Sequence, residues 1–168
     1  QFWSPIAFVL LLGTSWGVGD AWARSNIHFW HAMTGQLNDA VDALARKFNE
    51  RQRDYEVKPL YKGTYPETLT AAMAAYRTKT SPHIVQVFDV GTQTMLLSGA
   101  IMPVFQMMRE QGMVIDWGDF IQPVLSYYSM DGRLYSMPFN SSTPILYYNK
   151  DAFQKAGLSP DRPPTTWR

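Results

Sequence analysis

Short apolar runs and segments of helical periodicity alternate along the first hundred residues. Residues 27–30 and 57–61 are short apolar runs of the length that strands have, and both are predicted strands. Between them, apolar side chains recur at helical spacing from Leu37 to Phe48, which predicts an amphipathic helix. The order at this point is strand, helix, strand.

The same alternation continues through the next forty residues. Thr64 and Glu67 have the spacing of a capping box, and Pro66 suits a first helical turn, so a second helix is predicted to begin there. Residues 84–88 are apolar apart from one glutamine, as in a strand covered on both faces, and residues 92–97 begin a further helix. This order predicts an α/β fold with a parallel sheet and helices outside it.

The pattern loosens after residue 101. Asp131 and Gly132 form a turn signal inside residues 127–137, which predicts a hairpin that interrupts the simple alternation. A further strand is predicted over residues 144–148 and a short helix over residues 151–156.

The first 23 residues have the features of a secretory signal peptide. An unbroken apolar run at residues 6–12 is too short to cross a bilayer, and Ala21-Trp22-Ala23 provides the small side chains of a cleavage site. No Lys or Arg precedes the run, so the sequence is expected to start inside the signal peptide. A buried helix or a membrane anchor is the alternative. At the other end, residues 160–167 predict a loop leading into a helix, and the natural protein is expected to continue.

Composition narrows the function classes. The 168 residues are 46% hydrophobic and 17% charged, as in an ordinary globular domain, with a net charge of +1 spread without blocks. This balance argues against nucleic acid as a partner. The sequence contains no cysteine, which excludes disulfides, thiol catalysis and cysteine-ligated zinc.

The residues that most often do chemistry do not form a catalytic or metal-binding pattern. His28 and His31 would point to opposite faces of a strand, and His83 has no ligand neighbour in sequence, so no metal site and no cofactor are predicted. Ser141 and Ser142 lack the motif of a nucleophile elbow, which disfavours a serine hydrolase.

Two residues are candidates for ligand binding. Asp89 follows the apolar run 84–88, at the carboxyl end of a predicted central strand, where open α/β sheets bind ligands. Its alternative role is the N-cap of the following helix. Tyr65 is either an aromatic packed in the first turn of its helix or a hydrogen-bond donor to a polar solute, and the residues leave both open.

Several segments resemble the periplasmic sn-glycerol-3-phosphate-binding proteins of ABC importers, and a weaker motif at residues 147–157 resembles extracellular solute-binding proteins of the maltose-binding type. The segments that carry the first resemblance are Phe29-Trp30-His31, Tyr61-Lys62-Gly63-Thr64-Tyr65, Gln86-Val87-Phe88-Asp89-Val90-Gly91-Thr92 and Pro138-Phe139-Asn140-Ser141-Ser142-Thr143-Pro144.

The resemblance implies a type II periplasmic-binding-protein-like fold with two lobes. Residues 24–140 would form the first lobe, and residues 141–168 would cross the hinge and begin the second. Tyr65, Asp89 and Ser142 fall where these proteins contact their ligand. At position 89 well-known relatives have Glu, so one methylene less shortens the reach of this carboxylate.

The implied function is that of a non-enzymatic receptor, monomeric and periplasmic, that binds glycerol-3-phosphate or a glycerophosphodiester and delivers it to the permease of an ABC importer. A receptor for a sugar or oligosaccharide is an alternative within the same fold. A periplasmic phosphoester hydrolase is a third possibility, but it needs a nucleophile, base or metal set that residues 24–168 do not show.

Overall fold

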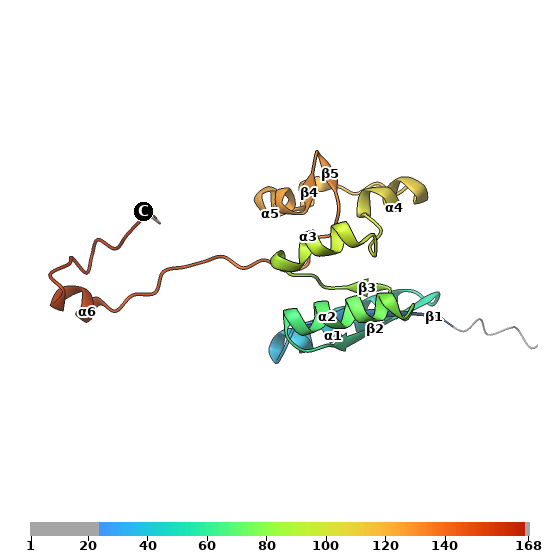
Figure 1. Cartoon of the computed structure of the whole chain (residues 1–168), viewed down its shortest axis with the longest axis horizontal. Coiled ribbons are helices and arrows are strands. Elements are labelled where there is room, and N and C mark those ends of the chain that lie inside the picture. Colours follow the sequence, from blue (N-terminus) through green and yellow to red (C-terminus); the bar gives the residue numbers. More distant parts are fainter. Residues whose placement is uncertain (1–23, 167–168) are drawn as a thin grey trace, which may run out of the picture. The chain divides into compact units, whose positions relative to one another are not determined.

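The computed structural model describes residues 24–166, which divide into two compact units, one ending at Ala100 and the other beginning at Ile101 (Figure 1). The predicted signal peptide, residues 1–23, lies outside the described residues. The predicted division into lobes near residue 140 stays a prediction.

The first unit contains a parallel sheet in which β1 (Ser25–His31) is the middle strand. It pairs along its whole length with β2 (Tyr55–Tyr61) and at two positions with β3 (Ile84–Val85). Pro59 lies within β2, and because proline has no N–H to donate, it suits a strand that is paired on one side only. The predicted strands at 27–30 and 57–61 and the parallel α/β architecture are confirmed.

Helices connect these strands. α1 (Gln36–Arg51) joins β1 to β2, and α2 (Tyr65–Arg77) joins β2 to β3. Strand order β2-β1-β3 makes the two crossovers run in opposite directions, so their usual right-handedness puts the two helices on opposite faces of the sheet. Each helix turns small or branched side chains inward: Val41 and Ala45 from α1, and Thr68, Ala72 and Ala75 from α2.

The third strand is shorter than its apolar run predicted. Only Ile84 and Val85 pair as β3, and the helix α3 (Asp89–Ser98) begins three residues earlier than expected. Among the described strands β3 pairs with β1 alone, so it is an edge strand here and not the predicted central strand. An apolar run is equally suited to a segment that leaves the sheet and enters a helix while remaining inside the core, which periodicity cannot distinguish.

The second unit begins with α4 (Val104–Gln111), the 3₁₀ helix η1 (Trp117–Asp119) and α5 (Gln122–Tyr127). A hairpin of β4 (Ser129–Met130) and β5 (Arg133–Leu134) follows. This confirms the predicted hairpin, with shorter strands.

The hairpin is held by its turn and by α4. Asp131 and Gly132 both have positive φ angles, 51° and 70°, as a two-residue turn that matches strand twist requires. The ring of Phe105 on α4 meets the ring of Tyr135 edge to face, with centroids 5.2 Å apart, and Leu134 is buried.

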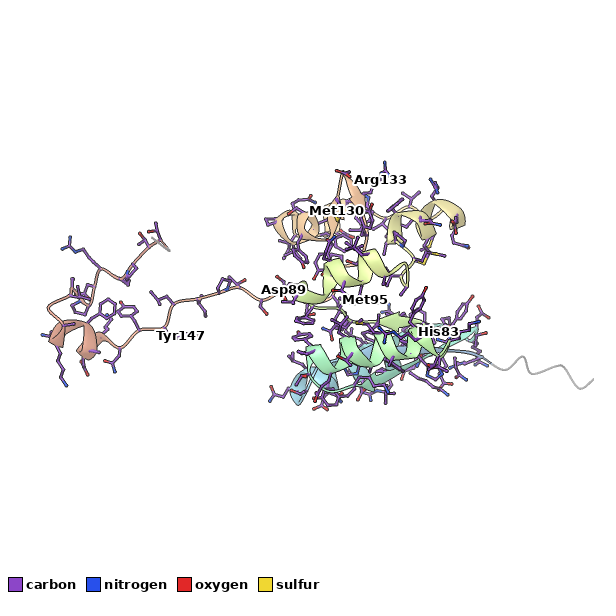
Figure 2. All side chains as sticks on the ribbon, viewed as in Figure 1. His83, Asp89, Met95, Met130, Arg133 and Tyr147 are labelled. Atoms are coloured by element: carbon purple, nitrogen blue, oxygen red, sulfur yellow. The ribbon has the colours of Figure 1, made fainter. Side chains whose placement is uncertain are left out.

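The predicted strand at residues 144–148 is wrong. These residues form neither strand nor helix, and Ile145 and Tyr147, the latter labelled in Figure 2, are 66% and 86% exposed. Apolar composition does not make a strand unless a neighbour takes up its N–H and C=O groups, and no described strand does so. The helix predicted after it is confirmed as α6 (Lys150–Lys155), which Asn149 caps by accepting a hydrogen bond from the Ala152 amide.

Of the helices within residues 24–166, none has both the length and the apolar character needed to cross a bilayer.

We expect Gly63→Ala to destabilise the protein by about 1–3 kcal/mol. Gly63 has φ +93°, and an added Cβ would collide with the carboxylate of Glu67, which accepts hydrogen bonds from the Thr64 amide and hydroxyl at the start of α2. Urea unfolding measures the change. Gly99→Ala is the matched control, because Gly99 also has a positive φ but nothing lies within 4 Å of its added Cβ. Equal losses for the two variants would contradict the collision at Gly63.

Candidate functional site

The carboxyl ends of the three parallel strands form the edge where this class of sheet binds ligands. β1 ends at His31, β2 at Tyr61 and β3 at Val85. The loops that follow these strands therefore lie at one edge of the first unit, and we call it the ligand edge.

Gln86 connects two of these loops. Its side-chain oxygen Oε1 accepts a hydrogen bond from the Ala32 amide at 2.9 Å. Its backbone N–H donates to the Trp30 carbonyl at 2.8 Å. The side chain is buried, with 7% of its surface exposed. In the sequence, Gln86 stood out only as the one polar residue in an apolar run. A lone polar residue in such a run was the signal of its structural role.

His31 lies at the end of β1 and is almost fully buried, with 1% exposed. Burial lowers the pKa of its imidazole below 6.5, and the negative charge of Asp42 opposes this only in part. A neutral ring agrees with the geometry, since Nδ1 accepts a hydrogen bond from the Met33 amide at 3.3 Å. His31 is thus part of the framework of the loop after β1.

Tyr65 and Asp89 are brought to the same part of the ligand edge. Tyr65 is the first residue of α2, and its ring stacks on Phe88 with centroids 5.6 Å apart and an angle of 16° between the planes. Phe88 is the N-cap residue of α3, and Asp89, labelled in Figure 2, is the first residue of that helix and is exposed. The alternative that Asp89 serves as the N-cap is therefore wrong.

A close approach between α2 and α3 supports this stack. Gly91 is buried, and a Cβ there would lie 2.9 Å from Cδ2 of Leu69. The stack and this contact together set the two helix beginnings beside each other. Helix N-termini carry partial positive charge, and at α2 the carboxylate of Glu67 already accepts the Thr64 amide there.

Lys62 supplies a full positive charge to the same edge. It directly follows β2, and its amide donates to the His31 carbonyl at 2.9 Å. Its ammonium group lies 4.0 Å from the centre of the Trp30 ring, a cation–π contact that restricts the side chain.

The histidines outside the ligand edge form a pair that the sequence did not reveal. Nδ1 of His83 accepts a hydrogen bond from the His28 amide at 3.1 Å, and the two rings stack with centroids 5.7 Å apart. In residues 24–166 no three His, Asp or Glu side chains gather as a metal site requires.

Comparison with known proteins shows the family of this chain. The profile of the bacterial extracellular solute-binding proteins matches residues 43–168. The sn-glycerol-3-phosphate-binding periplasmic protein UgpB of Shigella dysenteriae is 51% identical over 153 residues, which are 90% of this chain and 35% of that protein. UgpB of Agrobacterium fabrum is 51% identical over 150 residues, 88% of this chain and 34% of its own length. The chain belongs to the bacterial extracellular solute-binding proteins.

Solved structures agree on the fold. CpMnBP1 with mannotriose bound is 22% identical, with a TM-score of 0.61 over 85% of this chain and 35% of its own. The cyclic alpha-maltosyl-1,6-maltose binding protein of Arthrobacter globiformis is 24% identical, with the same TM-score over 86% of this chain and 36% of its own. The type II solute-binding fold is thereby confirmed, and the chain spans about a third of the length of the relatives it matches.

The third residue predicted for the site, Ser142, belongs to the second unit. It is exposed in a segment without helix or strand. Its place in the site stays a prediction.

We expect the protein to lose stability as the pH falls below 6.5, the ordinary pKa of histidine, because burial lowers the pKa of His31 in the folded state. The unfolded chain then binds the proton more readily, so unfolding is favoured progressively until the pH passes the folded pKa. Urea unfolding between pH 7.5 and pH 5 measures this dependence. His31→Asn, which keeps an acceptor for the Met33 amide, should weaken it, whereas His28→Asn should retain it. An unchanged slope in His31→Asn would contradict the assignment.

Proposed function

We propose that the protein, in its full natural length, is a periplasmic receptor that captures sn-glycerol-3-phosphate and delivers it to the permease of an ABC importer. The observation that carries this proposal is the 51% identity, over nine-tenths of the chain, to proteins named for binding that solute. The proposal includes a signal peptide at residues 1–23, a monomeric receptor, and binding without turnover.

The geometry of the ligand edge supports an anionic solute that also carries hydroxyl groups. The Tyr65 hydroxyl is a donor suited to a phosphate oxygen, and it belongs to the first residue of α2. Lys62 adds a cation at the same edge. We assign the phosphate to this group of donors.

Asp89 suits the hydroxyl groups of glycerol, because an ionised carboxylate can only accept hydrogen bonds. It is exposed at the start of α3, next to the Phe88 ring on which Tyr65 stacks. Asp is one methylene shorter than Glu, about 1.5 Å, so a contact that Glu makes directly is expected to pass through a water here. The proposal also includes Ser142, whose hydroxyl can donate a hydrogen bond to the ligand.

We expect Asp89→Ala in the full-length protein to weaken binding of glycerol-3-phosphate by more than about tenfold, or 1.4 kcal/mol. The reason is the loss of the acceptor for the glycerol hydroxyls. Titration calorimetry measures the affinity, with glycerol-3-phosphate and maltose as separate ligands. Asp89→Glu should bind at least as tightly as the parent protein, because it restores the longer reach.

Asp54→Ala is the matched control. It removes an exposed carboxylate of the same unit just before β2, at the opposite edge of the sheet, and should leave the affinity unchanged. A heat of binding with maltose and none with glycerol-3-phosphate would leave the fold assignment intact and would overturn the proposed substrate. Tight binding of glycerol-3-phosphate that Asp89→Ala does not alter would overturn the assigned site.

A further inference from the structure

Phe88 links the two residues of the first unit that the proposed function assigns to the ligand. It is the N-cap residue of α3 and directly precedes Asp89 in the chain. Its ring stacks on the ring of Tyr65, with centroids 5.6 Å apart and an angle of 16° between the planes. The proposed function gives Phe88 itself no part in binding.

The main chain is held on both sides of Phe88. Two residues before it, the side-chain oxygen of Gln86 accepts a hydrogen bond from the Ala32 amide. After it α3 begins, and the Phe88 carbonyl accepts hydrogen bonds from the Gly91 amide at 3.0 Å and from the Thr92 hydroxyl at 3.2 Å. The Phe88 ring therefore projects from a backbone with a fixed position.

Tyr65 depends on such a neighbour for the orientation of its side chain. Its backbone is held by the capping box, in which the Glu67 carboxylate accepts a hydrogen bond from the Thr64 amide at 2.7 Å. Side chains inside a helix are restricted by the turn that precedes them, but Tyr65 is the first residue of α2 and has no such turn. Its hydroxyl is at the far end of the ring, so a change of rotamer would move this donor by several ångströms.

The stack provides the missing restriction. Two aromatic rings in an offset stack are stabilised beyond the area that they bury, so the Phe88 ring favours one orientation of the Tyr65 ring. An aliphatic side chain at position 88 would fill similar space without this preference.

We propose that Phe88 is a positioning residue of the ligand site: its ring holds the Tyr65 hydroxyl where it donates to a phosphate oxygen. Phe88 then contributes to the affinity through Tyr65 and not through a contact of its own. The inference rests on the proposed function and deepens it.

The test is a set of double-mutant cycles in the full-length protein, with the affinity for glycerol-3-phosphate measured by titration calorimetry. Phe88→Leu removes the ring and keeps most of the apolar volume, and we expect it to weaken binding about fivefold. Tyr65→Phe removes the hydroxyl and keeps the stack. In the Tyr65→Phe protein, Phe88→Leu should change the affinity less than about twofold, because no hydroxyl is left to position. In the Asp89→Ala protein it should keep its effect of about fivefold, because Asp89 is not the residue that the ring orients.

Two further variants separate positioning from a general loss of structure. Phe88→Tyr keeps a ring in the stack and should bind like the parent protein. Phe48→Leu is the matched control, because it makes the same change near the end of α1, which leads back to the beginning of β2, and it should leave the affinity unchanged. Urea unfolding checks that each variant is folded. Phe88→Met, of similar volume, takes the place of Phe88→Leu if that variant does not fold.

Unchanged binding in Phe88→Leu overturns the positioning role and leaves the receptor function intact. Equal weakening in the parent and in the Tyr65→Phe protein means that Phe88 acts independently of the Tyr65 hydroxyl, which also overturns it. A weakening that disappears only in the Asp89→Ala protein overturns it too, since Phe88 would then act through Asp89. Weak binding by Phe88→Tyr has the same meaning for the stack. Failure of the parent protein to bind glycerol-3-phosphate overturns the receptor function itself.

Discussion

The structure of the first unit depends on the parallel pairing of β1 with a strand on each side. β2 pairs with β1 at seven positions, but β3 pairs with β1 at only two. Two strand pairs hold the chain that leads to Asp89 only weakly. The buried side-chain oxygen of Gln86 compensates by accepting a hydrogen bond from the Ala32 amide, just beyond the end of β1. A buried N–H without a partner costs about 1–3 kcal/mol, so this one bond helps to keep the two loops in register.

From this constraint the ligand edge acquires its polar groups. The Tyr65 and Phe88 stack joins the beginning of α2, which follows β2, to the beginning of α3, which follows β3. Lys62 adds a positive charge just after β2. The proposed function assigns the phosphate to Tyr65 and Lys62 and the glycerol hydroxyls to Asp89.

Local signals in the sequence predicted most elements of the fold. Helical periodicity and the Thr64 and Glu67 capping box identified α1 and α2, because those signals act within a few residues of the chain. The strands at 84–88 and 144–148 were predicted less well, since a strand depends on partners that lie far away in sequence. For the same reason the sequence could name Tyr65 and Asp89 as candidates, but not the Phe88 stack or the Gln86 bond.

The central claim is that the carboxyl edge of the β2-β1-β3 sheet holds the ligand through Tyr65 and Asp89. A crystal structure of the full-length protein with glycerol-3-phosphate tests it most directly. The account predicts a phosphate oxygen within about 2.6–3.2 Å of the Tyr65 hydroxyl, and a glycerol hydroxyl bonded to Asp89 directly or through one water. A ligand bound at the other edge of the sheet, or one that touches neither side chain, would contradict it.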